Sequence, residues 1–175
     1  MTIRWIPAAV TAFSSALFSY PALGFGNPEN PMTNLMTLNG SCFEEVELFG
    51  RNAGKTTCKP MMNTVYRDGR TGFYFSTDNY ILTFSGIAPQ INKTINSVIQ
   101  PIDLILFNDT RNGDPSNPTK LRAAGTCMFA NPFQGVPILI TCKAETPEGR
   151  FATTFRSDGS EPVIIMKDGQ MIQDQ

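Results

Sequence analysis

The side chains of this chain that could perform acid–base chemistry are carboxylates. A glycoside hydrolase needs two facing acids, one to protonate the leaving group and one to act as nucleophile or base. The candidates for such a pair are Glu44, Glu45, Glu47, Asp103, Glu145 and Glu148. In an extended segment Glu45 and Glu47 share one face while Glu44 lies on the other, as is typical of a solvent-facing or edge strand. We therefore expect no catalytic residue among Glu44, Glu45 and Glu47. A carboxylate-dependent carbohydrate hydrolase that uses two of the six acids is kept as an alternative function.

Histidine is absent from the sequence, and its absence excludes several reaction classes. Ser-His-Asp and Cys-His catalysis, zinc held by histidine and histidine pH switching all require an imidazole. The four cysteines are even in number and too widely spaced for a zinc or thiol-exchange pair, so we expect two disulfides rather than a thiolate nucleophile. We predict no metal site and no cofactor.

One order of landmarks occurs twice along the chain. The first copy comprises Gly40-Ser41-Cys42, Cys58-Lys59, Gly69-Arg70, Phe75 and Asp78, and the second comprises Gly125-Thr126-Cys127, Cys142-Lys143, Gly149-Arg150, Phe155 and Asp158. This order predicts two pseudo-repeated halves, about 35–107 and 121–170. Of the three possible disulfide connectivities, the repeat favours Cys42 with Cys58 and Cys127 with Cys142. Each would close a loop of about 16 residues and add roughly 3 kcal/mol of stability by the loop-entropy treatment.

The repeated arginines and aspartates are the most interesting polar candidates. Arg70 precedes Asp78 by eight residues, and Arg150 precedes Asp158 by the same interval. Two equivalent pairs could form symmetric anion sites or cross-strand salt bridges. The aspartates also suit turn positions, where the carboxylate accepts a hydrogen bond from its own backbone. A ligand-binding role and a structural role both stay open.

The N-terminus has the features of a secretory signal peptide. Arg4 is followed by a mostly apolar stretch and then by small residues near Gly24, a pattern that favours cleavage there. The apolar run is shorter than the roughly 20 residues that cross a bilayer, so we predict no membrane span after cleavage. We expect a signal peptide over residues 1–24, a flexible lead-in over 25–34 and a single β domain over 35–175.

Charge does not point to a polyanionic partner. The chain carries 14 Lys and Arg against 15 Asp and Glu, and the basic residues are scattered singly. Nucleic-acid binding would require a basic patch with interleaved aromatic residues, so we expect no nucleic-acid partner. The oligomeric state stays open.

Short apolar or alternating segments separated by turn residues predict about ten strands. They are Leu35–Leu38, Phe43–Phe49, Thr56–Tyr66, Thr71–Ser76, Tyr80–Ser85, Val98–Phe107, Leu121–Phe129, Val136–Lys143, Phe151–Arg156 and Val163–Met166. Such a series is typical of an antiparallel sandwich or partly closed barrel, here with one disulfide stapling a hairpin in each half. No capped apolar pattern of helical period persists, so we expect little helix.

Turns and loops add detail to this prediction. Asp68-Gly69, Asp158-Gly159 and Asp168-Gly169 supply residues that accept positive φ. On the strand after the first of these turns, Phe73 and Phe75 would enter the core and Tyr74 would point to the opposite face. Segments 87–96 and 108–118 are expected to be loops, the second of them joining the two halves.

The sequence also resembles a group of small exported proteins of Gram-negative bacteria. The resemblance rests on the signal peptide and on Leu38-Asn39-Gly40-Ser41-Cys42, Asp68-Gly69-Arg70-x-Gly72-Phe73-Tyr74-Phe75, Thr83-Phe84-Ser85-Gly86 and Ser157-Asp158-Gly159. It implies export to the periplasm. No activity, ligand or site residue comes with it.

These observations favour a non-enzymatic periplasmic or secreted module that binds an envelope or extracellular ligand. Export, disulfides and an all-β frame suit recognition, while the lack of histidine and of free thiols removes most catalytic options. The hydrolase described above is one alternative, and a structural envelope protein without a ligand is another. An apolar pocket in the fold would favour binding of a small molecule.

Overall fold

The computed structural model of this chain describes residues 29–48, 51–52, 58–87, 97–111 and 117–172, with the side chains of 44–48 and 51–52 outside that description. These residues form an all-β structure with a single short 3₁₀ turn, Pro132–Gln134. The strands are β1 (Met32–Leu38), β2 (Gly40–Leu48), β3 (Arg51–Asn52), β4 (Met61–Tyr66), β5 (Arg70–Ser76), β6 (Tyr80–Ile87), β7 (Ser97–Asp109), β8 (Thr119–Ala130), β9 (Leu139–Thr146), β10 (Gly149–Ser157), β11 (Val163–Lys167) and β12 (Gln170–Met171). All ten predicted strands are present.

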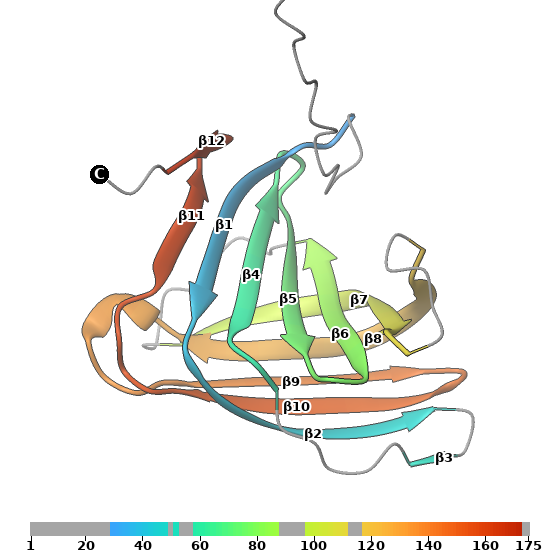
Figure 1. Cartoon of the computed structure of the whole chain (residues 1–175). Helices are drawn as coiled ribbons and strands as arrows, with labels where there is room; N and C mark the ends of the chain where they lie inside the picture. Colours follow the sequence, from blue (N-terminus) through green and yellow to red (C-terminus); the bar gives the residue numbers. More distant parts are fainter. Residues whose placement is uncertain (1–28, 49–50, 53–57, 88–96, 112–116, 173–175) are drawn as a thin grey trace, which may run out of the picture.

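The strands form one antiparallel sheet that curls into a partly closed barrel (Figure 1). Their order is β12-β11-β1-β4-β5-β6-β7-β8-β9-β10-β2-β3. Only Asn39 separates β1 from β2, yet β1 pairs with β11 and β4 while β2 pairs with β10 and β3. The chain segments β1–β2 and β10–β11 each bend and run from one end of the sheet to the other. The predicted fold class, an antiparallel sandwich or partly closed barrel, is confirmed.

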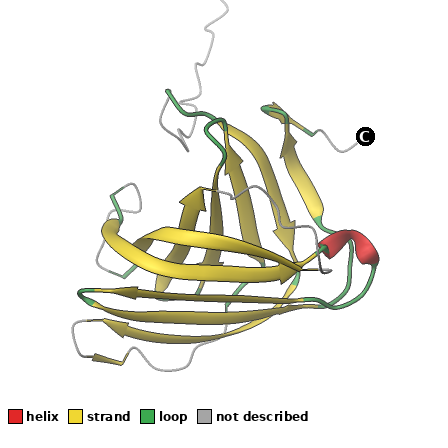
Figure 2. Cartoon of the chain, turned by 180° about the vertical axis from the view of Figure 1, so that it is seen from behind, coloured by secondary structure: helices red, strands yellow, loops and turns green. Residues whose placement is uncertain are grey.

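Two groups of strands cross one another in Figure 1. The upright strands are β11, β1, β4, β5 and β6, and the transverse strands are β7, β8, β9, β10 and β2; the reverse view shows the same crossing (Figure 2). The main core includes side chains from both groups. Phe73 on β5 lies 5.3 Å from Phe129 on β8 between ring centroids, and Phe151 and Phe155 of β10 are fully buried.

Both predicted disulfides are present, but they have different structural roles. Cys127 and Cys142 are directly opposite each other in the β8–β9 hairpin and have no solvent exposure. Cys42 and Cys58 connect β2 to the segment that leads into β4. The expectation of a stapled hairpin in the first half is wrong, because the bend at Asn39 carries β2 to the transverse strands while β4 pairs with β1.

The boundaries of the predicted lead-in and second loop also need correction. β1 begins at Met32, inside the expected flexible lead-in 25–34, and Thr33 Oγ1 donates a 3.1 Å hydrogen bond to the Val65 carbonyl. Pairing with β4 orders these residues despite their Pro- and Asn-rich surroundings. Asn108 lies in β7 and is buried, rather than opening a loop. Most of the other predicted loop, 88–96, lies outside the described residues.

The predicted turn residues Gly69, Asp168 and Gly169 have the positive φ angles expected of them. Gly69 has φ 83° between β4 and β5, and Asp168 and Gly169 have φ 51° and 79° between β11 and β12. Glycine adopts these left-handed conformations without a Cβ clash, and aspartate tolerates them better than most residues. Within the described part of the chain, no helix has the length and apolar character needed to cross a membrane.

The two disulfides should contribute unequally to stability. Their loops are nearly equal, 15 and 16 residues of separation, so chain entropy alone predicts about 3 kcal/mol for each. The double substitution Cys127→Ala/Cys142→Ala also removes two sulfurs from the core, so it should lower the free energy of unfolding more than Cys42→Ala/Cys58→Ala. Urea denaturation of both variants measures the difference. An equal or reversed loss would contradict this assignment of the core.

Candidate functional site

Strand β5 shows that this sheet has two apolar faces. Phe73 and Phe75 are buried in the main core, and Tyr74 between them lies on the opposite face, as predicted. The strand pairing aligns Tyr74 with Met62 on β4 and with Thr83 on β6. Thr83 in turn aligns with Leu106 on β7. We call the face that carries this row, across β1, β4, β5, β6 and β7, the second face.

The second face carries a cavity of about 520 Å³ that is partly open to solvent, and Met171 at its border is 61% exposed. Apolar side chains from β12, from upright strands and from β7 line it: Leu35, Met62, Ile81, Leu106, Met166 and Met171. Met32 and Pro118 add to this lining, and every residue that the described structure places there is uncharged. The volume lies in the range of small-molecule pockets, which are typically 300–1,000 Å³ and mostly apolar.

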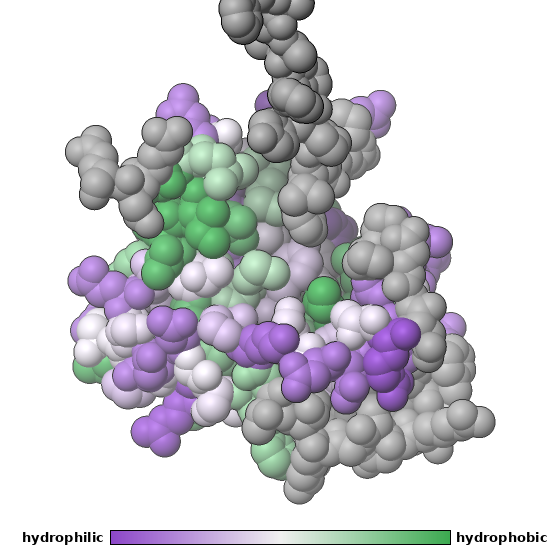
Figure 3. All heavy atoms as spheres, in the orientation of Figure 1, coloured by the Kyte–Doolittle hydropathy of each residue, from purple (hydrophilic) through white to green (hydrophobic). Residues whose placement is uncertain are grey.

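Methionine gives this lining an adaptable character. Four of the eight methionines of the chain border the cavity, namely Met32, Met62, Met166 and Met171. An unbranched thioether side chain can fill irregular gaps and adjust to ligands of different shape. Figure 3 shows hydrophobic side chains gathered over β11 and β1, at the end of the sheet that supplies Met166 and Leu35. We therefore expect the cavity to select for polarity more than for exact shape.

A small group of hydroxyls interrupts the apolar lining. The Tyr66 and Tyr74 hydroxyl oxygens are 3.1 Å apart and share one hydrogen bond, in which either oxygen can donate. Burial, followed by this bond, raises the pKa of Tyr74 above its ordinary value, and the nearby Thr64 hydroxyl acts in the opposite direction. The Tyr74 phenol is therefore neutral at physiological pH.

Thr64 is the unsatisfied member of this group. Its side chain is 2% exposed and borders the cavity. Its hydroxyl lies near enough to the Tyr74 phenol to lower the pKa of that group, but no described residue meets it with the geometry of a hydrogen bond. Leaving a buried hydroxyl unpaired costs about 1–3 kcal/mol. Asn108 also lines the cavity and is 7% exposed. The lining thus contains one buried hydroxyl that a ligand could satisfy, with the Asn108 amide as a further polar group.

Gly72 allows this arrangement to form. It precedes Tyr74 by two positions on the same face of β5, where a Cβ atom would come within 2.8 Å of Tyr74 Cε2 and 2.9 Å of Thr64 Oγ1. No real Cβ tolerates such contacts without movement of its neighbours. The Tyr74 ring and the Thr64 hydroxyl can therefore pack against the β5 backbone only because residue 72 lacks a side chain.

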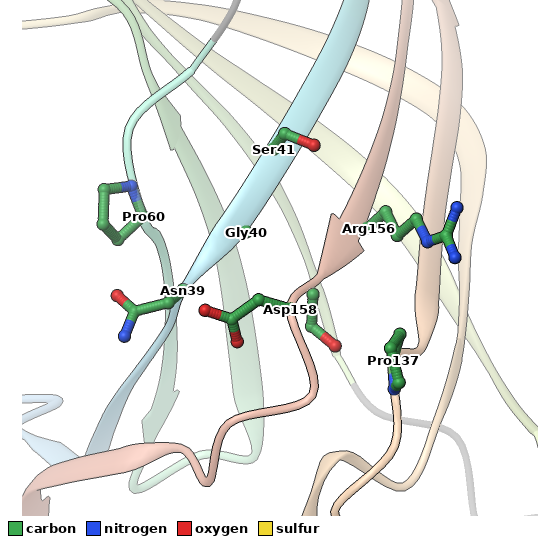
Figure 4. A pocket seen from close by; sticks show the side chains of 8 residues that line it. Asn39, Gly40, Ser41, Pro60, Pro137, Arg156 and Asp158 are labelled. Atoms are coloured by element: carbon green, nitrogen blue, oxygen red, sulfur yellow. The ribbon is translucent and has the colours of Figure 1, made fainter.

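A second hollow lies at the corner where β1 bends into β2, and it is less suited to a ligand (Figure 4). It has a volume of about 620 Å³ and is wide open to solvent. Figure 4 shows the Arg156 and Asp158 side chains pointing to opposite sides. Asp158 Oδ1 already accepts hydrogen bonds from Ser160 N and Ser160 Oγ, at 2.8 and 2.6 Å. This carboxylate stabilises a turn, which is the structural role considered above.

The predicted arginine–aspartate pairs do not form as expected. Arg70 donates a bidentate pair of hydrogen bonds to Asp103, at 2.7 and 3.0 Å, and Asp78 forms an exposed ion pair with Lys59 at 3.2 Å. Arg150 is the second residue of β10, and Asp158 comes directly after the last. Eight residues of extended chain span about 26 Å, which is too far for a contact within one strand. The missed partner, Asp103, comes from β7, and the short repeat could not identify it.

The candidate carboxylates are not gathered at the cavity. Asp103 is bound to Arg70, which lowers the pKa of Asp103 through that hydrogen bond. Glu145 is exposed on β9, and Glu148 lies in the β9–β10 turn. Glu44, Glu45 and Glu47 lie on β2, where their side chains are outside the described structure. In the described part of the chain, no three acidic, cysteine or histidine side chains cluster in a way that could hold a metal ion.

Comparison with models of protein families, with curated proteins and with solved structures finds no match to this chain. The functional argument therefore rests on the geometry and chemistry of the cavity.

Tyr74 should ionise at a higher pH than an exposed tyrosine. A raised pKa in the folded state stabilises the fold fully below the unfolded pKa of about 10, and this contribution is lost as pH rises through the folded value. Titration of the tyrosine ring carbons by NMR should show Tyr74 still protonated near pH 10. Tyr66→Phe removes the shared hydrogen bond and should lower the Tyr74 pKa in part. A Tyr74 that titrates at about 10 in the folded protein would contradict its burial.

Proposed function

We propose that this protein is an exported, non-enzymatic module that binds a small apolar molecule in the second-face cavity. The observation that carries the proposal is the cavity itself, about 520 Å³ in volume and lined by uncharged, mostly apolar side chains. Such pockets hold small ligands by burying most of the ligand surface, with a few polar groups fixing orientation.

Binding without catalysis is supported by the composition of the lining. The described lining residues include no carboxylate, lysine or cysteine that could act as nucleophile, acid or base. Tyrosine and threonine are present, but the raised pKa of Tyr74 makes its phenolate inaccessible near neutral pH. A hydrolase that uses the carboxylates named above would have to work elsewhere on the molecule.

We further propose that residues 1–24 direct the chain to an oxidising compartment, either the periplasm or the exterior, and are removed there. The two disulfides support this, because such bonds persist mainly in oxidising compartments. The internal repeat is likewise proposed as the origin of the two cysteine pairs. The pairing of β8 with β9, but not of β2 with β4, means that any duplication was followed by a change in strand connections.

Filling the cavity should abolish binding. Leu106→Trp places an indole where a leucine borders the cavity, and Ile81→Trp does the same from β6. The wild-type protein should enhance the fluorescence of N-phenyl-1-naphthylamine, an uncharged apolar dye, and both variants should reduce its affinity at least about tenfold, since they occupy the space that it needs.

Leu139→Trp is the matched control, because Leu139 is 57% exposed on β9 and remote from the lining. It should bind the dye as the wild type does. Circular dichroism of all variants checks folding. Equal dye binding by folded Leu106→Trp, Ile81→Trp and Leu139→Trp would place the binding site elsewhere, and absence of binding by the wild type would favour the structural alternative.

A further inference from the structure

The polar groups of the cavity restrict the chemistry of its ligand, and this argument rests on the proposed function. We infer that the ligand is an uncharged molecule with an apolar body and one hydrogen-bond-accepting oxygen, such as a ketone, ester or alcohol, and that this oxygen binds at the hydroxyl group formed by Thr64, Tyr66 and Tyr74. Two independent features, the absence of charged side chains from the described lining and the unpaired Thr64 hydroxyl, lead to this assignment.

The charged side chain on this face of β5, Arg70, is paired with a carboxylate and does not line the cavity. Arg70 lies on the same face of β5 as Gly72 and Tyr74, two and four positions earlier. Asp103 binds its guanidinium through two hydrogen bonds, at 2.7 and 3.0 Å, and Ser85 Oγ accepts a third at 3.3 Å. No cation or anion is therefore available in the described lining to pair with a charged ligand. Burying an unpaired carboxylate or ammonium group is strongly unfavourable.

The three hydroxyls leave hydrogen-bonding capacity unused, and each of them can both donate and accept. Tyr66, Tyr74 and Thr64 together carry three hydroxyl protons, and the single Tyr66–Tyr74 bond uses one of them. The Thr64 hydroxyl has no partner in the described structure, although it is 98% removed from solvent and borders the cavity. A ligand oxygen that accepts from Thr64 Oγ1 would give this buried hydroxyl a hydrogen-bond partner.

Thr153 provides a comparison within the same molecule. Its hydroxyl is also buried and unpaired among the described residues, and the side chain is 1% exposed on β10. It lies in the main core, away from the cavity lining. Replacing either threonine with valine removes an unsatisfied hydroxyl and keeps the side-chain shape, so neither variant should lower the urea midpoint of unfolding. Only Thr64→Val should change ligand selection.

Competition with N-phenyl-1-naphthylamine at pH 7 tests the inference. The competing ligands are 2-decanone, decanoate, decylammonium and pentylbenzene, which differ in charge and in hydrogen-bonding capacity. We expect 2-decanone to bind at least about tenfold more tightly than either ion, because the cavity offers no counter-charge. Thr64→Val should weaken 2-decanone about three- to tenfold, the effect of one hydrogen bond, and change pentylbenzene less than about twofold. Thr153→Val should change neither ligand.

Failure of this inference is distinct from failure of the proposed function. If the dye and pentylbenzene bind to the wild type, but decanoate competes as well as 2-decanone or Thr64→Val leaves the 2-decanone to pentylbenzene ratio unchanged, the ligand assignment is wrong and the binding module stands. If no probe binds to the wild type, both proposals fall. Should Thr64→Val not fold, Thr64→Ala also removes this hydroxyl and should produce the same selective loss.

Discussion

Strands β4, β5, β6 and β7 carry apolar or buried side chains on both faces, and this constraint determines the rest of the structure. On β6 the five residues from Leu82 to Gly86 are all buried. The transverse strands cover only one face of this sheet, where Phe73, Phe75 and Phe84 pack. The second face keeps its apolar side chains only partly buried, with Leu35, Met62 and Leu106 half-buried at the border of the open cavity. Covering this surface would gain the free energy of burying apolar area.

The polar residues of the second face are as informative as the apolar ones. A fold selected only for stability would place valine where Thr64 stands, because an unpaired buried hydroxyl is costly and valine has nearly the same shape. Gly72 fits the same picture. A side chain at position 72 would clash with the Tyr74 ring and the Thr64 hydroxyl, so this group of hydroxyls requires glycine there. The presence of this group at the border of an apolar cavity is the physical basis of the binding proposal.

Sequence patterns predicted the features that depend on neighbouring residues in the chain, namely which face of a strand a side chain occupies and where the turns lie. Period-two alternation placed Phe73 and Phe75 in the core and Tyr74 opposite, and the turn residues Gly69 and Gly169 have the expected positive φ. The cavity could not be predicted, because its residues come from strands whose order depends on the bend at Asn39. The same limit explains the arginine partners: Arg70 binds Asp103 from a different hairpin, whereas the repeat suggested a residue of its own strand. Thr64 gave no signal in the sequence, since a threonine on a strand is unremarkable until its missing partner is seen.

The most direct test of the second-face cavity is an NMR titration of protein labelled with ¹³C at the methionine methyl groups, using 2-decanone as the ligand. Met32, Met62, Met166 and Met171 line the cavity, whereas Met61 is fully buried in the main core and Met128 is 48% exposed on β8. The account predicts saturable shifts of the first four signals and little change in Met61 and Met128. Shifts centred on Met61 or Met128, or no saturable shift in the four lining methionines, would contradict it.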